Sequence, residues 1–202
     1  MPVSASPRPK SPSSLGSNRH RSGRRTANTA RRTGVLQEQQ LRQHGLLPSS
    51  ERMAQGPVAI IECIEEIPCN PCVDACPKKA IKIEGSIICQ PSVDFAACNG
   101  CGTCVARCPG LAIFIVNMNY RATEASVALP YEFLPRPTPG STVQALDRAG
   151  RIVCQARVER VLDSKALDRC AVVTVAVPKR FGNRVRGIRL PQIQTKVRES
   201  GA

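Results

Sequence analysis

Tryptophan is absent from this sequence of 202 residues, and aromatic side chains make up only 3% of it. Any core must therefore consist mainly of Val, Ile, Leu and Ala. No apolar run is long enough for a membrane span, and no apolar segment follows the basic N-terminus as it would in a signal peptide. The paired arginines Arg24–Arg25 and Arg31–Arg32 are not followed by the apolar segment of a twin-arginine signal. We therefore expect a cytoplasmic protein.

Histidine is almost as scarce and occurs only as His20 and His44, both in the N-terminal part. A histidine general base in the folded part is thus excluded. No glycine-rich fingerprint or phosphate-binding loop follows a strand pattern, so flavin and nicotinamide sites are not predicted. Carboxylates such as Glu65, Glu66 and Glu84 are explained by surface solubility. The sequence therefore predicts no catalytic residues and no enzymatic substrate site.

Cysteine, in contrast, is abundant, with 11 residues, of which nine lie between Cys63 and Cys108. Dense cysteine without an export signal favours metal binding over disulfides. One run has the spacing C-x2-C-x2-C-x3-C-P that is typical of 4Fe–4S clusters and consists of Cys98, Cys101, Cys104 and Cys108. A related upstream run, also followed by proline, consists of Cys63, Cys69, Cys72 and Cys76. The two runs predict two iron–sulfur clusters.

Residues 57–118 contain two copies of one unit, each with a strand, a cysteine loop, a helical turn and a second strand. The sequence Cys-Pro-x-x-Ala-Ile occurs in both copies, at 76–81 and at 108–113. Over this segment the chain resembles the bacterial two-cluster ferredoxins. The resemblance implies an α+β fold with a pseudo-twofold repeat, two 4Fe–4S clusters and the transfer of single electrons.

The resemblance also implies that each cluster takes its fourth ligand from the other run. Carried over residue by residue, the ligands of cluster 1 are Cys63, Cys69, Cys72 and Cys108. Those of cluster 2 are Cys98, Cys101, Cys104 and Cys76.

The first run departs from the family pattern, because five residues separate Cys63 from Cys69 and Glu66 stands where a cysteine is expected. We expect residues 64–68 to form a wider loop that still brings Cys63 to the iron. Cys89 is the rival ligand, although as part of an apolar segment it also fits the role of a small apolar side chain. A three-iron cluster at this position is a third option that the sequence leaves open.

Residues 119–202 have another character, with strand patterns at 151–159 and 170–177 and weaker ones at 142–146 and 184–190. With a hairpin turn at 148–150, they predict a small antiparallel β sheet or barrel that follows the cluster domain. The remaining cysteines, Cys154 and Cys170, lack metal-ligand spacing, and we expect them to be buried as small apolar residues.

The order of the parts, with the segments Cys63–Cys72 and Leu129–Pro135, is similar to the small iron–sulfur subunits of FAD-dependent dehydrogenases for amines and amino acids. These act on substrates of the proline, hydroxyproline, sarcosine and opine type. The resemblance implies an electron-transfer subunit whose partners are a flavoprotein dehydrogenase subunit and a downstream electron acceptor. Residues 119–202 are then the expected docking module, with Tyr131, Phe133 and Leu134 as its apolar anchor.

Residues 1–52 are rich in Ser, Arg, Pro and Gln, and we predict a disordered basic tail because such a segment buries too little apolar surface. Met53 is an alternative start position, and a chain that begins there is expected to keep both clusters.

The formal net charge of +14 is uneven, with +8 in residues 1–52, −2 in 57–120 and +8 in 130–202. The basic flanks leave open a second function, nucleic-acid binding by a protein whose clusters are structural, although aromatic residues that could stack on bases are few. A zinc-binding interaction module is a third reading, because C-x2-C pairs also suit zinc.

Overall fold

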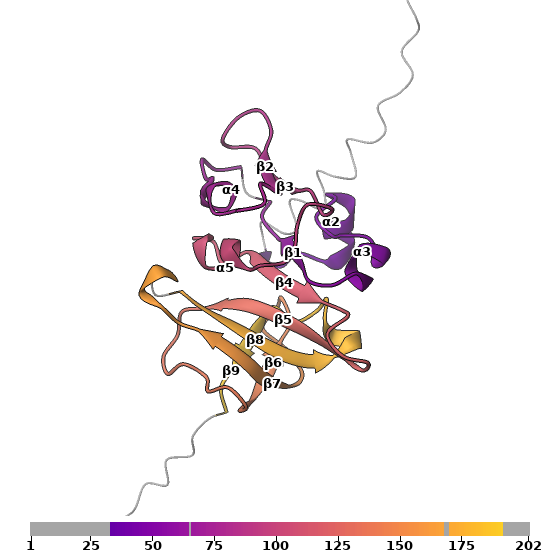
Figure 1. Cartoon of the computed structure of the whole chain (residues 1–202), viewed down its shortest axis with the longest axis vertical. Helices are drawn as coiled ribbons and strands as arrows, with labels where there is room; N and C mark the ends of the chain where they lie inside the picture. Colours follow the sequence, from indigo (N-terminus) through magenta and orange to yellow (C-terminus); the bar gives the residue numbers. More distant parts are fainter. Residues whose placement is uncertain (1–32, 65, 168–169, 192–202) are drawn as a thin grey trace, which may run out of the picture. The chain divides into compact units, whose positions relative to one another are not determined.

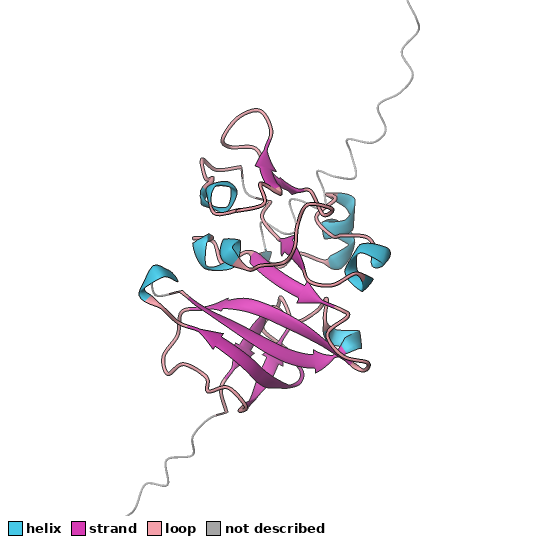
Figure 2. Ribbon diagram, viewed as in Figure 1, coloured by secondary structure: helices cyan, strands magenta, loops and turns pink. Residues whose placement is uncertain are grey.

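The structure, a computed structural model, describes residues 33–64, 66–167 and 170–191 (Figure 1). Helices and strands from α2 to β9 belong to the larger structural unit, Val35–Ala202. Strand predominates and the α-helices are only four to six residues long, so the expected α+β fold is in fact mainly antiparallel β (Figure 2). No helix among the described residues has the length and apolarity needed to cross a bilayer.

One sheet of seven antiparallel strands runs through the molecule in the order β1-β4-β5-β8-β7-β6-β9. Its first three strands are β1 (Val58–Ile61), β4 (Ile113–Asn117) and β5 (Glu124–Tyr131). The others are β6 (Thr142–Leu146), β7 (Ile152–Leu162), β8 (Ala171–Pro178) and β9 (Gly187–Arg189). Short 3-10 turns, η1 (Lys165–Leu167) and η2 (Lys179–Phe181), flank β8.

The sequence predicted that a separate β sheet follows the cysteine-rich segment, and the structure corrects this prediction. The outer strands of this segment, β1 and β4, pair with each other, and β4 continues into β5 through a short turn. The two predicted parts thus share one hydrogen-bonded sheet. The inner strands, β2 (Ile81–Ile83) and β3 (Pro91–Val93), form a ladder of their own.

The strands nearest the cysteines carry a core on each face, because successive side chains of a strand point to opposite sides. In β1, Ile60 packs into the large core of the β sheet, whereas Ala59 and Ile61 pack on the cysteine side. In β4, Phe114 faces the first core and Ile113 the second. This double burial explains why these strands are continuously apolar rather than alternating.

The sheet curls so that its two edge strands meet at one end. Glu62 directly follows β1 and Arg186 directly precedes β9, and Arg186 Nε lies 2.6 Å from Glu62 Oε1. Val185 and Ile188 share the large core with Ile60. The predicted sheet or barrel is therefore a strongly curved sheet that includes the two outer strands of the cysteine region.

Residues 33–52 correct part of the predicted disordered tail, whereas residues 1–32 lie outside the described residues. Helix α2 (Glu38–Gln43) buries Leu41 completely, and helix α3 (Ser50–Ala54) buries Met53. The hydroxyl of Ser49 accepts a hydrogen bond from the Arg52 N–H and caps α3. The sequence pattern did not predict these short helices, because each contains only one or two apolar side chains and so shows no helical periodicity.

Candidate metal centre

The cysteine side chains of the central segment gather around two pockets. The first is lined by Cys63, Cys69, Cys72, Cys89 and Cys108. The second is lined by Cys76, Cys98, Cys101 and Cys104. All of these cysteines are free thiols. Each pocket thus brings together three cysteines of one run with the fourth cysteine of the other.

Two short helices hold the buried member of each set. Helix α4 (Pro71–Asp74) starts at a proline, which suits the first helical turn, and it buries Cys72. Helix α5 (Thr103–Arg107) buries Cys104.

A glycine in the second run allows the chain to pass β1 closely. Gly100 has φ +66°, and a Cβ atom there would lie 2.6 Å from the carbonyl carbon of Pro57. Only glycine fits at this position between Cys98 and Cys101, since any side chain would clash with backbone atoms. Close approach of the loop to the start of β1 therefore depends on this residue type.

The turns that follow Cys76 and Cys108 have the same geometry. Lys79 and Leu111 both adopt φ 51°, which is rare for residues other than glycine. The N–H of Lys79 donates to the Cys76 carbonyl at 3.0 Å, and that of Leu111 donates to the Cys108 carbonyl at 3.1 Å. The next N–H in each turn, of Ala80 or Ala112, donates to the cysteine Sγ, at 3.2 and 3.4 Å.

These N–H groups point at sulfur atoms that would otherwise lack polar partners. A third such bond joins the Ala59 N–H to Cys98 Sγ at 3.4 Å. Hydrogen bonds to ligand sulfurs stabilise thiolate and are one of the factors that set the potential of an iron–sulfur cluster. The donor set is therefore suited to thiolate ligands in both pockets.

Burial and mutual repulsion both act on the thiols. Burial raises the pKa of Cys104 to about 12, and the neighbouring Cys101, Cys98 and Cys76 add to this rise. Burial likewise raises the pKa of Cys72 to about 11, with contributions from Cys108, Cys69 and Cys63. The cysteines that act on each buried thiol are the other three members of its predicted set. Four thiolates so close together require a compensating positive charge, which iron ions provide.

Cys89 lines the first pocket but is exposed, in the loop that follows β2. It is absent from the cysteines that raise the pKa of Cys72, whereas Cys63 is among them. Gln90 Nε2 donates to the Ile64 carbonyl at 3.0 Å and so connects the residue after Cys63 to the segment that leads into β3. Cys63 and Cys89 both line the first pocket. Glu65 lies outside the described residues.

Within the described ranges, no three His, Cys, Asp or Glu side chains are grouped closely enough to bind one metal ion. Zinc–sulfur bonds of about 2.3 Å would bring four ligand sulfurs within about 4 Å of one another.

Arg52 belongs to the site, although the sequence placed it in the tail. Its guanidinium donates to the carbonyls of Phe95 at 2.6 Å and Cys98 at 2.5 Å. It also donates to the carbonyls of Gly56 and Pro57. Arg52 thereby joins the segment that leads into Cys98 to the start of β1. The one local signal was Ser49, a helix-capping residue shortly before the apolar Met53.

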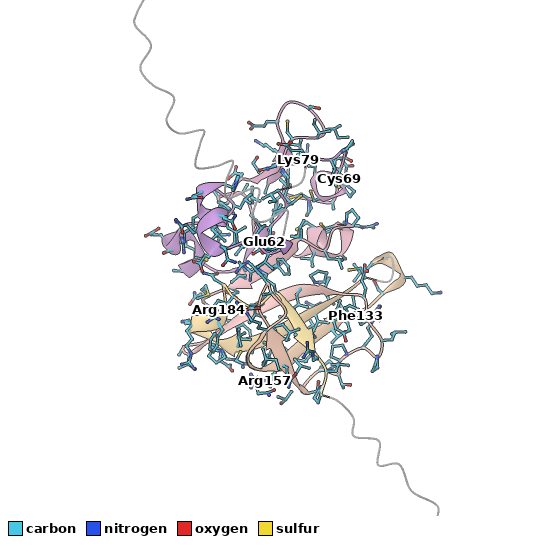
Figure 3. All side chains as sticks on the ribbon, turned by 180° about the vertical axis from the view of Figure 1, so that it is seen from behind. Glu62, Cys69, Lys79, Phe133, Arg157 and Arg184 are labelled. Carbon is cyan, nitrogen blue, oxygen red and sulfur yellow. The ribbon has the colours of Figure 1, made fainter. Side chains whose placement is uncertain are left out.

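Glu62, labelled in Figure 3, directly precedes the predicted ligand Cys63. It forms a buried ion-pair cluster with Arg148 and Arg186. Arg148 donates to both carboxylate oxygens, at 2.8 and 2.6 Å, and Arg186 donates at 2.6 Å. The Arg186 guanidinium stacks 4.9 Å from the Phe114 ring centroid, and its Nη2 is buried without a hydrogen-bond partner in the described structure. Burial lowers the pKa of Arg186 to about 10, so the group stays charged at neutral pH.

The remaining cysteines and the expected apolar anchor show mixed outcomes. Cys170 is buried at 3% exposure, as predicted, whereas Cys154 is only partly buried. Tyr131 is buried in the sheet core and cannot serve as an exposed anchor. Phe133 and Leu134 are exposed at 72% and 83%.

Known proteins share the second part of this site. Residues 91–114 match the family model described as a 4Fe-4S binding domain. The ferredoxin-type protein NapF of Haemophilus influenzae is 48% identical over 52 residues, which cover 25% of this chain and 30% of that relative. No solved structure matches the chain. Residues 91–114 are therefore similar to 4Fe-4S binding domains, and a quarter of the chain is similar to part of a ferredoxin-type protein.

Proposed function

We propose that the chain binds two 4Fe–4S clusters and relays single electrons between them. The observation that carries this proposal is the gathering of nine cysteines around two separate pockets, five at the first and four at the second. Cluster 1 is assigned to Cys63, Cys69, Cys72 and Cys108, and cluster 2 to Cys76, Cys98, Cys101 and Cys104. Each cluster supplies a site that gains or loses one electron.

The protein contributes ligand placement and a controlled environment. Turns after Cys76 and Cys108 direct N–H groups at the ligand sulfurs, and α4 and α5 bury one ligand of each set. The apolar residues Ile61, Ile113 and Ile115 line the pockets and limit the access of water. Each of these features changes the potential of a cluster without direct participation in the redox step.

We further propose that the chain is an electron-transfer subunit and not an enzyme by itself. A flavoprotein dehydrogenase subunit is the proposed donor, and a separate protein is the downstream acceptor. The exposed Phe133 and Leu134, in the loop after β5, are consistent with a protein-binding surface. Dense free cysteine suits a reducing compartment, so the cytoplasm is the proposed location.

An anaerobic preparation of the full chain tests the cluster assignment. It should contain about eight irons per chain, four for each cubane cluster, and show charge-transfer absorbance in the visible range. Stoichiometric zinc without this absorbance would show that the assignment is wrong.

Two cysteine variants test the irregular first site. Cys63→Ser should remove about half of the iron, because it takes one ligand from one of two clusters. Cys89→Ser is the matched control and should leave the iron content unchanged, since Cys89 lies between the two cysteine runs and belongs to neither. Loss of half the iron in Cys89→Ser would instead assign Cys89 as a ligand.

A further inference from the structure

The turns that follow Cys76 and Cys108 have similar backbone conformations, but their side chains differ in charge. The turn after Cys76 carries Lys78 and Lys79, whereas the equivalent turn after Cys108 carries Gly110 and Leu111. Backbone φ angles and hydrogen bonds are the same in both turns. The two turns therefore place different side chains beside the two proposed clusters.

The lysines beside the second pocket are exposed and unpaired. Lys78, Lys79 and Lys82 are all exposed, and among the described residues none of their ammonium groups takes part in a hydrogen bond or ion pair. Lys78 lines the pocket itself, and Cys101, one of its four cysteines, is exposed. Lys78, Lys79, Lys82 and Cys101 are called the lysine surface below.

The nearest acidic groups form no ion pair with these lysines in the described part of the chain. Glu84 directly follows β2, and Asp94 directly follows β3, where its N–H donates to the Ala80 carbonyl. The Asp94 carboxylate already accepts hydrogen bonds from the N–H groups of Ala96 and Ala97. Arg52 adds a further positive charge next to Cys98. The second pocket thus has a cationic surrounding with an exposed sulfur ligand at its edge.

The first pocket has a different rim. Ile67 lines it and is 51% exposed, and Ile87 and Ile88, next to Cys89, are 50% and 43% exposed. Glu66 and Glu84 are exposed on the same loops. Because this rim is apolar and acidic, the two proposed clusters present unlike surfaces to their surroundings.

We propose that the lysine surface is the docking site of an acidic redox protein that exchanges electrons with cluster 2. This inference rests on the proposed function. The reduced cluster gives up one electron, the redox group of the partner accepts it, and no bond is made or broken. Lys78, which lines the second pocket together with the exposed Cys101, and the neighbouring Lys79 and Lys82 steer an acidic partner to this side of the pocket.

The test compares two triple variants of the full chain that remove equal charge. Lys78→Gln, Lys79→Gln and Lys82→Gln are combined in the first. Arg160→Gln, Lys165→Gln and Arg189→Gln are combined in the control, whose exposed cations lie on β7, η1 and β9. Iron content and visible spectrum are recorded first, so that failure of cluster binding is recognised separately from failure of docking.

Each chain is then reduced, and its oxidation is followed by stopped flow with two small probes. Anionic cobalt(III)–EDTA should react about tenfold more slowly with the lysine variant than with the unmodified chain at low salt. Cationic hexaamminecobalt(III) should react faster with that variant. Both effects should vanish near 1 M salt, where the Debye length is about 3 Å.

Protein probes complete the test, with an acidic and a basic single-haem cytochrome as electron acceptors. Reduction of the acidic cytochrome should slow in the lysine variant and remain unchanged in the control variant. Equal rates in all three chains, with full iron content, would overturn the docking site and leave the proposed clusters intact. An equal decrease in both variants would assign the effect to net charge and overturn it as well.

Discussion

Arg52 is one residue, outside both cysteine motifs, on which the second pocket depends. Its guanidinium donates hydrogen bonds to the carbonyl of Phe95, which precedes the second cysteine run, and to the carbonyl of Cys98, the first cysteine of that run. Without it, these part-buried carbonyls lack a donor, and such a loss costs about 1–3 kcal/mol. Arg52→Ala should therefore lower the free energy of unfolding by this amount and reduce the iron content toward one cluster.

Iron per chain and urea denaturation measure this outcome. Arg42→Ala is the control, since Arg42 forms only an exposed ion pair with Glu38 within α2. A chain that starts at Met53 loses Arg52 together with the buried Leu41, so it should lose iron, contrary to the expectation from sequence. Full iron content in Arg52→Ala would show that the Cys98 segment holds its shape unaided.

Among the elements, the junction between the two sheet edges depends on a buried charge cluster. Among the described residues, Glu62 is the only acidic residue that forms an ion pair with Arg148 and Arg186, and the side chains of all three are at most 12% exposed. Glu62→Gln leaves two buried positive charges without compensation. The variant should lose about 3–5 kcal/mol of unfolding free energy, which is typical when one member of a buried ion pair is removed.

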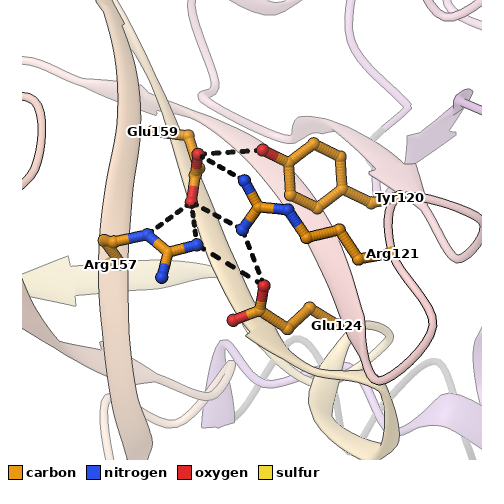
Figure 4. A network of polar contacts seen from close by, with 5 residues as sticks. All are labelled: Tyr120, Arg121, Glu124, Arg157 and Glu159. Atoms are coloured by element: carbon orange, nitrogen blue, oxygen red, sulfur yellow. Dashed lines mark hydrogen bonds and ion pairs between the residues drawn. The ribbon is translucent and has the colours of Figure 1, made fainter.

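Glu124→Gln provides the comparison for this loss, since Glu124 pairs with Arg121 and Arg157 on a more exposed surface (Figure 4). Exposed pairs contribute less than about 1 kcal/mol. Chemical denaturation of both variants should thus separate them clearly. Similar losses would indicate that the Glu62 cluster is hydrated in solution.

The same exposed network between β5 and β7 gives a dependence on pH. Partial burial raises the pKa of Glu159, but hydrogen bonds from Tyr120 and Arg157 and the charge of Arg121 outweigh it and leave the pKa below its ordinary value. Stabilisation by Glu159 is therefore complete above its unfolded-state pKa and is lost as the pH falls through the folded-state pKa.

Glu159→Gln should accordingly be less stable than the unmodified chain at neutral pH, by less than about 1 kcal/mol. The difference should shrink below about pH 4, as the carboxylate becomes protonated. Thermal or urea unfolding between about pH 3 and pH 7 measures it. A difference that grows on acidification would contradict the assigned direction of the pKa shift.

At the scale of the whole molecule, the shared sheet makes the cysteine region dependent on the C-terminal part. Strand β5 joins β4 to β8, and Phe114 and Val116 of β4 share a core with Val173 and Val175 of β8. Deletion of residues 136–202 removes β6 to β9 and exposes this core. We expect the truncated chain to aggregate and to bind little iron.

Solubility, circular dichroism and iron content of the truncated chain measure this expectation. The control is the double variant Phe133→Ser and Leu134→Ser. It changes the exposed loop after β5 that is proposed as a protein-binding surface, and it leaves the core intact. A truncated chain that folds and holds both clusters would show that residues 57–118 form an independent domain.

Strand β5 illustrates why part of the sheet escaped prediction. It contains Pro130, which usually argues against a strand because proline has no N–H to donate. In the structure, β4 pairs only with residues 126–128 of β5, so near Pro130 one edge of the strand is free of this partner. The proline is tolerated because of where β4 ends, which the local sequence does not reveal.

The sequence by itself determined the local features of this protein. Cysteine spacing identified both runs whose side chains line the two pockets, and the repeated Cys-Pro-x-x-Ala-Ile segment identified two turns with the same positive φ angle. Each half of residues 57–118 has the two strands that the repeat predicted, β1 and β2 in the first half and β3 and β4 in the second. Such features depend on residues close together in the chain, so their pattern is legible without a fold.

Only the tertiary structure decided how distant segments combine. Glu62 meets partners 86 and 124 residues away, and Arg52 meets the Cys98 carbonyl 46 residues away. The cysteine region and the β strands form one sheet because β4 has apolar side chains on both faces and must be covered on both. Long-range pairing of this kind depends on the mutual burial of surfaces, which the spacing of residues does not specify.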